Sequence, residues 1–217
     1  MPDRTVLVTG GAGGLGRAVV DKLVADGWHV VVPVKAESDL ETTDAISTVI
    51  ADLTDPDDVA RAVRAASGMK ALVNLVGGFA ANQPVADTPL DDFERLFRLN
   101  LRPTYLVTQA AWPSLKGGGS IVCVGSSAAL HPFAGGSGYA ASKAAVHAFA
   151  RAVAEEGKPD GIRCNAIVPR QIDTPANRAA MPESEHHKLV PPEQIANVIA
   201  FLISDDSAAV NGQLVGV

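Results

Sequence analysis

The sequence predicts an α/β protein, a doubly wound parallel sheet of about seven strands with helices on both faces. Short β-branched runs alternate with longer helical patterns along the chain, and such alternation requires right-handed crossovers between parallel strands. The apolar runs 71–76 and 120–124 lack strict polar alternation, as expected for strands buried on both faces. A glycine-rich turn also separates the first strand from the first helix.

The individual elements follow from the period of the apolar residues, which switches repeatedly between that of a strand and that of a helix. In the first half, we expect strands at 4–9, 29–34, 47–51 and 70–76 and helices at 15–26 and 56–66. In the second half, we expect strands at 119–125, 162–168 and 213–216 and helices at 90–115, 138–156 and 192–203. Residues 169–191 are expected to be irregular, and 174–190 to form a short substrate lid, because long loops in compact domains are usually functional.

The bulk composition is that of an ordinary soluble globular protein, with 47% hydrophobic and 19% charged residues among 217. We expect one domain over 1–217, since α/β folds often reach this length as a single unit. The net charge of −6 argues against nucleic acid as a partner. No stretch approaches the roughly 18 apolar residues of a membrane span, and no signal-peptide pattern precedes the first strand. A cytoplasmic protein without a membrane partner is expected, with Cys123 and Cys164 as reduced core residues.

The glycine-rich turn from Thr9 to Gly16 leads directly into the first helix. Glycine permits a tight turn and close approach to phosphates, and the helix N-terminus adds free N–H groups and positive potential. In this context the turn predicts a Rossmann-type dinucleotide site rather than a flexible surface turn. A P-loop would need a lysine where Arg17 and Ala18 stand. The candidate cofactor-binding residues here are Gly10, Gly14, Leu15 and Gly16.

The end of the second strand normally decides between NAD and NADP. An acid there bonds the adenosine ribose, whereas a basic residue accommodates a 2′-phosphate. Val34 and Lys35 occupy this place, so no carboxylate would repel a phosphate. Lys35 therefore favours NADP over NAD; an ordinary surface lysine is the alternative interpretation. Asp39 and Glu41 follow shortly and could approach the ribose instead.

Tyr139 and Lys143 lie one turn apart in the predicted helix 138–156 and therefore share a face. A tyrosine with a pKa of about 10 is a poor general base at neutral pH, and a nearby cation is expected to lower that pKa. Ser126 stands thirteen residues before Tyr139, at the end of the strand 119–125. Because strand ends face the ligand crevice of an open α/β sheet, its hydroxyl can bond a substrate oxygen as charge develops there.

Five motifs occur in a fixed order along the chain. They are the Thr-Gly-x-x-x-Gly-x-Gly turn at Thr9–Gly16, Asp52 after the third strand, Asn74-x-x-Gly77 after the fourth, Asn100 on the next helix, and Ser126 with Tyr139-x-x-x-Lys143. A Tyr-x-x-x-Lys pattern alone would often arise by chance, but five motifs in this order would not. Nearly the whole chain thus resembles the short-chain dehydrogenase/reductase family.

The resemblance implies hydride transfer between the nicotinamide of NAD or NADP and a carbonyl or alcohol carbon. It implies that Tyr139 gives or takes the proton, that Lys143 also bonds the nicotinamide ribose, and that Ser126 holds the substrate oxygen. Asn100 would fix a water that relays protons to Lys143, and Asp52 would hold adenine. The remaining cofactor residues that it implies are Leu53, Asn74, Gly77, Pro169, Ile172 and Thr174, the last of these at the nicotinamide carboxamide.

Several residues depart from the family pattern or carry less information. Arg170 follows Pro169 where the family usually has glycine, and would lie beside the nicotinamide or the substrate, or else in solvent. His131 and Phe133 are candidates to line the substrate site. His147, one turn after Lys143, fits helix packing or a subunit interface as well as catalysis. His186 and His187 have no matching metal-site spacing, so no metal is expected.

Two other functions remain open at this point. The stretch 173–178 with Met181-Pro182 resembles quinonoid dihydropteridine reductase, an enzyme that lacks the serine, so pteridine reduction is a minor alternative. A non-catalytic NAD(P)-binding sensor would keep the glycine turn and lose the proton-transfer residues, which are all present here. The family resemblance also implies a homodimer or homotetramer formed through the helices 90–115 and 138–156.

Overall fold

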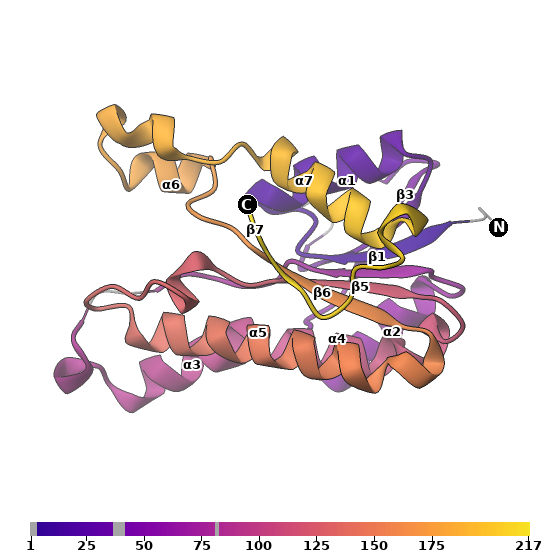
Figure 1. Ribbon diagram of the computed structural model, residues 1–217, viewed down its shortest axis with the longest axis horizontal. Helices are drawn as coiled ribbons and strands as arrows, with labels where there is room; N and C mark the ends of the chain where they lie inside the picture. Colours follow the sequence, from indigo (N-terminus) through magenta and orange to yellow (C-terminus); the bar gives the residue numbers. More distant parts are fainter. Residues whose placement is uncertain (1–3, 37–41, 81–82) are drawn as a thin grey trace.

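The computed structural model describes residues 4–36, 42–80 and 83–217 and contains one seven-stranded sheet (Figure 1). The strand order is β3-β2-β1-β4-β5-β6-β7, and every pair of neighbours is parallel. The strands are β1 Thr5–Thr9, β2 His29–Val34, β3 Ile46–Ile50, β4 Ala71–Asn74, β5 Ser120–Val124, β6 Arg163–Val168 and β7 Leu214–Gly216. The predicted doubly wound α/β fold is confirmed.

Helices cover both faces of the sheet, as Figure 1 shows. The α-helices are α1 Gly14–Ala25, α2 Pro56–Ala65, α3 Leu90–Asn100, α4 Arg102–Leu115, α5 Ser137–Glu156, α6 Pro175–Ala179 and α7 Pro192–Ile203. Short 3-10 helices are η2 Val85–Asp87, η3 Ser127–Ala129, η4 Lys158–Asp160, η5 Glu183–Lys188 and η6 Asp205–Ser207. Helices α1 and α7 pack on one face, while α2, α4 and α5 pack on the other.

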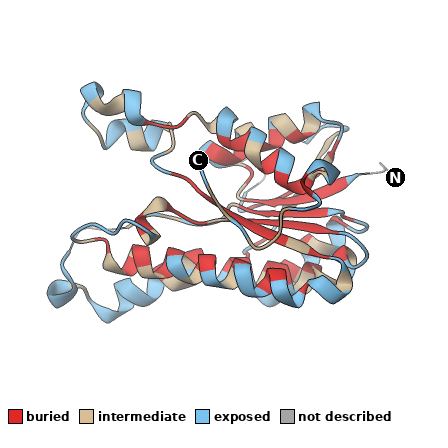
Figure 2. Ribbon diagram, viewed as in Figure 1, coloured by how far each residue is buried: buried red, intermediate tan, exposed pale blue. Residues whose placement is uncertain are grey.

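Each face of the sheet has its own apolar core, and both cores are buried in Figure 2. On one side, Leu23 of α1 and Ile199 of α7 pack over Val8 and Val32. On the other side, Val107 of α4 and Val146 of α5 belong to a cluster with Leu72 and Ile121 of the sheet. Burial on both faces explains why the strand sequences are apolar without alternation. It also fixes the strand ends as the place where polar groups gather.

The structure corrects two of the expected elements. The helix expected at 90–115 is two helices, because Pro103 stands in the first turn of α4 and has no N–H to continue the hydrogen bonding of α3. The break falls at Leu101, which is both the C-cap of α3 and the N-cap of α4. The segment 169–191 is less irregular than expected, since it contains α6 and η5.

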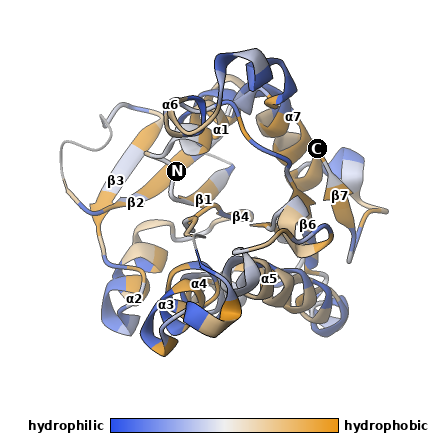
Figure 3. Ribbon diagram, turned by 90° about the vertical axis from the view of Figure 1, so that its left-hand side faces the viewer, coloured by the Kyte–Doolittle hydropathy of each residue, from blue (hydrophilic) through white to orange (hydrophobic). Residues whose placement is uncertain are grey.

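The carboxyl ends of the strands meet at one edge, which faces the viewer in Figure 3. The β1–α1 turn, Ser126 after β5 and the segment after β6 all lie along this edge. In open α/β sheets this edge is where ligands bind. In the part of the chain that the structure describes, no helix is long and apolar enough to cross a membrane.

Candidate active site

The β1–α1 turn packs so closely that side chains would not fit at its glycines. Gly10 has a φ of +70°, in the left-handed region that favours glycine. A Cβ on Gly16 would lie 2.1 Å from the carbonyl oxygen of Gly10. A Cβ on Gly14 would lie 2.9 Å from Cγ2 of Thr174, so the turn lies against the segment after β6. Two predicted cofactor-binding segments are thereby brought together.

The first turn of α1 has the properties of an anion site. Its N-cap, Gly13, has no side chain to cap the helix, and the first turn contains no acidic residue. The first N–H groups of a helix have no intrahelical partner and favour negative charge. The Oγ1 of Thr9 accepts the backbone N–H of Leu75 at 3.1 Å and so joins the ends of β1 and β4 beneath the turn. The cradle therefore fits a dinucleotide pyrophosphate.

The predicted adenosine side of the site lies at the ends of β2 and β3. Lys35 is exposed one residue after β2, and Asp52 is exposed while Leu53 is buried. The Asp52 carboxylate accepts the backbone N–H of Thr54 at 2.9 Å and its hydroxyl at 2.8 Å. These hydrogen bonds lower the pKa of Asp52, with a smaller contribution from the Lys35 charge. Asp39 and Glu41, the alternative ribose ligands, lie outside the described residues.

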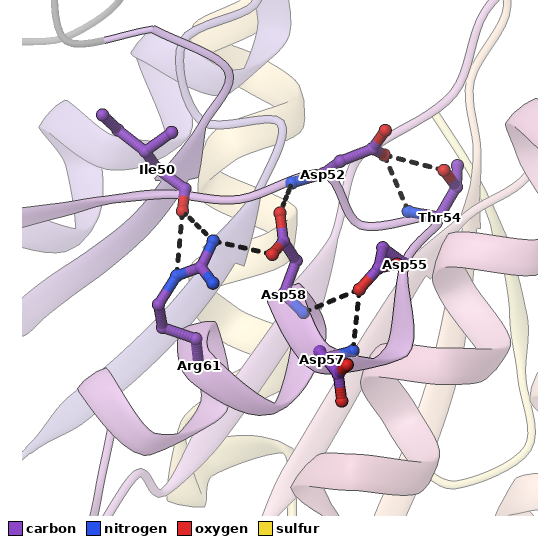
Figure 4. Close-up of polar contacts among 7 residues, drawn as sticks. All are labelled: Ile50, Asp52, Thr54, Asp55, Asp57, Asp58 and Arg61. Atoms are coloured by element: carbon purple, nitrogen blue, oxygen red, sulfur yellow. Dashed lines mark hydrogen bonds and ion pairs between the residues drawn. The ribbon is translucent and has the colours of Figure 1, made fainter.

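A polar network fixes the loop that carries Asp52 (Figure 4). The Asp52 backbone N–H donates to Oδ2 of Asp58 at 2.7 Å, and Asp58 forms an ion pair with Arg61 at 2.8 Å. Arg61 also donates to the carbonyl of Ile50 at the end of β3, at 2.7 Å. Asp55 caps α2 by accepting the N–H groups of residues 57 and 58. The start of α2 thus holds the Asp52 loop in place.

The structure brings the three predicted proton-transfer residues together. Tyr139 and Lys143 lie in the first two turns of α5, and Ser126 lies two residues after the end of β5. The Ser126 side chain lies close enough to the Tyr139 phenol to influence its pKa. The Lys143 ammonium, only 5% exposed, donates to the carbonyl of Val124 at 2.9 Å. A hydroxyl, a phenol and a buried cation therefore lie at the end of β5.

Asn100 lies behind this group, against the loop after β4. Its Oδ1 accepts the N–H of Gly78 at 2.8 Å, and its Nδ2 donates to the Gly78 carbonyl at 3.1 Å and to Oγ of Ser142 at 3.0 Å. A Cβ on Gly77 would lie 2.7 Å from Oδ1 of Asn100 and 3.0 Å from Nζ of Lys143. Gly77 thus leaves the room in which the Lys143 ammonium lies beside Asn100.

Comparison with known proteins connects this geometry to a family. The family model described as short chain dehydrogenase matches residues 4–185. This chain belongs to the short chain dehydrogenase family. It is therefore an NAD(P)-dependent dehydrogenase/reductase of the class that acts on alcohol and carbonyl groups.

Relatives are similar over nearly the full length of this short chain dehydrogenase. The 2-(R)-hydroxypropyl-CoM dehydrogenase of Xanthobacter autotrophicus is 32% identical over 96% of this chain and 94% of the relative. The cyclic-di-GMP-binding biofilm dispersal mediator protein of Escherichia coli is 32% identical over 97% and 94%. The structure of a short-chain type dehydrogenase/reductase from Mycobacterium ulcerans has a TM-score of 0.92 at 28% identity, covering 100% and 89%.

One electrostatic expectation for this short chain dehydrogenase is wrong. Burial raises the pKa of Tyr139 above its ordinary value of 10.0, the hydrogen bond from Ser126 opposes the rise, and Lys143 is not among the causes. The Lys143 ammonium is instead occupied by the Val124 carbonyl, and burial lowers its own pKa from 10.5 to about 8. The phenol is therefore protonated at neutral pH.

The segment after β6 carries the remaining predicted cofactor residues. The Pro169 carbonyl accepts the N–H of Ser127 at 2.9 Å, which ties this segment to the serine loop. Thr174 is the N-cap of α6, and Ile172 pairs with Val190 at the base of the segment 174–190. Arg170 is exposed, and its backbone N–H donates to the carbonyl of Val217 at 3.0 Å.

Asn74 is buried at the end of β4. Its Nδ2 donates to Oγ1 of Thr108 at 3.2 Å, while its Oδ1 has no hydrogen-bond partner among the described residues. A buried amide oxygen of this kind is an unsatisfied hydrogen-bond acceptor. The side chain joins β4 to α4 at the carboxyl end of β4.

The sequence analysis missed one aromatic residue beside the proton-transfer group. The ring of Phe79 makes an edge contact with that of Tyr139, at a centroid distance of 4.9 Å. Phe133, a predicted lining residue, lies 6.3 Å from Phe79, whereas His131 is exposed on the same loop. A large apolar residue directly after Gly77-Gly78 in a loop was the available signal. Exposed rings therefore adjoin the phenol.

Proposed function

We propose that this short chain dehydrogenase interconverts a carbonyl and an alcohol, with Tyr139 as its general acid and base. The observation that supports this most directly is the group formed by Ser126, Tyr139 and Lys143 at the carboxyl end of β5. A hydroxyl beside a protonated phenol can bind one substrate oxygen from two sides. The phenol then supplies or removes the proton on that oxygen.

The cofactor would lie along the carboxyl edge of the sheet. Bound NAD(P) supplies or accepts the hydride. Gly10, Gly14, Leu15 and Gly16 would hold its pyrophosphate, Asp52 and Leu53 its adenine, and Asn74, Gly77, Pro169, Ile172 and Thr174 its nicotinamide half. We propose NADP over NAD, because the exposed Lys35 follows β2 where a 2′-phosphate would lie.

In the direction of reduction, the Tyr139 phenol would donate its proton to the carbonyl oxygen. Its raised pKa favours the protonated form that this step needs. The Ser126 hydroxyl would donate to the same oxygen and stabilise its developing charge. The Lys143 cation, on the next turn, would bond the nicotinamide ribose. Asn100 would fix a water that returns a proton by way of Lys143.

The side chains around the phenol favour substrates with an apolar group next to the carbonyl. Phe79 is 64% exposed, and Phe133 and Leu130 are also exposed. Phe79 contacts both the Tyr139 and the Phe133 rings. An aryl group of a substrate could bury this exposed surface and stack on these rings. We therefore propose aryl or other planar apolar ketones and quinones ahead of small polar carbonyls.

The segment 174–190 would cover the substrate as a lid within a single domain spanning 1–217. Its two ends are joined by the bridge between Ile172 and Val190. Arg178 of this segment pairs with Asp173 just before it, at 2.5 Å, and within the segment Nε2 of His186 lies 3.0 Å from the carbonyl of Arg178. These contacts support a lid that moves as one piece.

Turnover by the purified protein tests the proposed function. Ketones, quinones and quinonoid pterins are assayed with NADPH and NADH, and we expect aryl ketones or quinones to give the highest kcat/KM. Tyr139→Phe is expected to lower kcat about 100-fold or more while the cofactor Kd stays unchanged. Equal turnover by wild type and Tyr139→Phe would refute the role of Tyr139.

The same assay separates the alternatives. Preference for quinonoid pterins would favour the dihydropteridine-type reductase that the stretch 173–178 resembles. Cofactor binding without turnover of any substrate would favour a non-catalytic sensor, a possibility raised also by the E. coli relative, whose name describes ligand binding. The presence of Asn100, Ser126, Tyr139 and Lys143 together supports the enzyme over the sensor.

A further inference from the structure

We infer that His147 is a positioning residue that holds the backbone of Ser126 in the proton-transfer site. The inference rests on the proposed function, because it concerns the serine that would bind the substrate oxygen. His147 lies on α5, one turn beyond Lys143, and its ring points to the loop that follows β5. No hydrogen bond joins it to the Tyr139 phenol among the described residues, so it would act through Ser126.

The contact between the two residues is a buried hydrogen bond. The backbone N–H of Ser126 donates to Nε2 of His147 at 3.3 Å. His147 is 5% exposed and Ser126 is 9% exposed, so water cannot easily replace the acceptor. A buried N–H that loses its acceptor costs about 1–3 kcal/mol. Without the imidazole, the loop is therefore expected to shift so that the Ser126 N–H finds another acceptor.

Gly125 provides the room that this contact needs. A Cβ at Gly125 would lie 2.0 Å from Nε2 and 2.3 Å from Cδ2 of His147. Gly125 is not among the glycines with positive φ, so its backbone conformation is open to any residue. The absence of a side chain is thus explained by the imidazole and not by the turn. Gly125 and His147 form a matched pair.

Other hydrogen bonds hold the segment around Ser126, but they do not involve its backbone N–H. Its backbone is extended, with φ −164° and ψ 146°, and its Oγ accepts the N–H of Ala128 at 3.2 Å. The next residue, Ser127, donates its N–H to the Pro169 carbonyl at 2.9 Å. His147 adds a bond to the backbone N–H of Ser126 from α5, the helix that also carries Tyr139. The inferred role of this bond is to hold the serine where its hydroxyl adjoins Tyr139.

The bond also defines the state of the imidazole. Because Nε2 accepts a hydrogen bond, it carries no proton, and the proton of the neutral ring lies on Nδ1. Burial, and to a smaller extent the charge of Lys143, lower the pKa of His147 below its ordinary value of 6.5. Both effects keep the imidazole neutral, so that Nε2 can accept the hydrogen bond from Ser126.

Three variants and one control test the inference by kinetics. His147→Leu removes the acceptor, Gly125→Ala displaces the ring, and His147→Gln places an amide oxygen near the position of Nε2. We expect kcat to fall roughly 10- to 100-fold in the first two, with unchanged cofactor Kd, and His147→Gln to restore most of the loss. His29→Leu is the control, because it removes a histidine that lies away from the site. The Nε2 of His29 is hydrogen-bonded to Oγ of Ser47 at 3.0 Å. This control variant is expected to leave kcat unchanged.

A second measurement does not depend on activity. Nitrogen-15 NMR of the imidazoles in the free protein is expected to show His147 with its proton on Nδ1, and Gly125→Ala to change its Nε2 shift. A proton on Nε2, or a His147→Leu variant with wild-type kcat, would overturn the inference. Failure of the proposed function would appear instead in the wild type and in Tyr139→Phe, where His147 is intact.

Discussion

At the residue scale, the buried ammonium of Lys143 is expected to make cofactor binding depend on pH. Burial lowers its pKa to about 8, so the free protein loses this cation as the pH rises through about 8. The cation is proposed to bond the nicotinamide ribose, and binding would in turn raise its pKa. Cofactor Kd, measured by fluorescence titration between pH 7 and 10, is expected to rise above pH 8.

The Lys143→Met variant provides the reference for that titration. It is expected to bind the cofactor weakly and without the change near pH 8. The free energy of unfolding should increase over the same pH range in which cofactor binding weakens. Between about pH 8 and the ordinary lysine pKa of 10.5, Lys143 binds fewer protons in the folded than in the unfolded state, because its folded pKa is lowered. Over that range, wild type should gain stability relative to Lys143→Met. A Kd that rises equally in both proteins contradicts the assignment.

The proposed preference for NADP also depends on a single residue, Lys35. Lys35→Ala removes the exposed cation after β2, and we expect the ratio of kcat/KM for NADPH over that for NADH to fall about 10-fold. Lys70→Ala, an exposed lysine that precedes β4 at the opposite edge of the sheet, is the matched control. If NADH is used at least as well as NADPH and Lys35→Ala changes neither, the proposed preference is wrong.

Sequence reasoning placed the proton-transfer residues by their spacing, and the structure brings Ser126, Tyr139 and Lys143 together; their catalytic roles stay predictions. The sequence could not reveal that the Lys143 ammonium is bonded to a backbone carbonyl, which depends on how α5 packs on β5. For the same reason, the pairing of Gly125 with His147 was not predictable. The reason for a glycine at position 125 becomes clear only when the residue that occupies the space of its Cβ is known.

At the scale of elements, the β1–α1 turn depends on Gly16. A Cβ there would lie 2.1 Å from the Gly10 carbonyl oxygen and 2.6 Å from Cα of Gly11, so backbone would have to move. Gly16→Ala is expected to lower the free energy of unfolding by about 3 kcal/mol and to weaken cofactor binding. Denaturant unfolding measures the first effect and fluorescence titration the second.

Gly216→Ala is the matched control for that substitution. Gly216 lies in β7, and a Cβ there would meet no atom within 4 Å. Its φ is outside the left-handed region, so the change in stability is expected to be within about 0.5 kcal/mol. Equal stability of Gly16→Ala and Gly216→Ala would show that the turn relaxes more easily than its packing indicates.

The period of apolar residues predicted every strand of the sheet, and hence the fold class, because burial on both faces leaves a clear signal. It failed where one residue outweighs the pattern. Pro103 divides an apolar periodicity that continues across it into α3 and α4. The segment 169–191 lacks such a period, yet Thr174 caps α6 through a side-chain bond to Asn177. Local capping formed a helix there that periodicity alone does not reveal.

At the scale of the whole molecule, an exposed tyrosine on α4, beside a half-buried phenylalanine on α5, is a candidate contact for the predicted homo-oligomer. Tyr105 is 47% exposed, and its ring lies 6.1 Å from that of Phe149 on the neighbouring helix. Light scattering after gel filtration is expected to give two or four times the mass of one chain. Tyr105→Glu should lower that mass, since it places a charge in an apolar contact.

Val85→Glu is the control for surface charge. Val85 is 72% exposed in η2, outside both helices, and its substitution should leave the mass unchanged. A monomeric wild type would contradict the predicted assembly. A mass that is the same for wild type and Tyr105→Glu would place the subunit contact on another face.

Helix α5 carries Tyr139, Lys143 and His147 on one continuous 20-residue rod, whereas the rings of Phe79 and Phe133 come from two separate loops. The proposed proton donor and the ring of Phe79 therefore come from different segments of the chain. The loop around Phe79 could be exchanged among relatives to change which ketone is accepted, without altering Ser126, Tyr139 or Lys143. The same division allows substrate range to diverge in evolution by a few loop substitutions while the reaction itself is inherited intact.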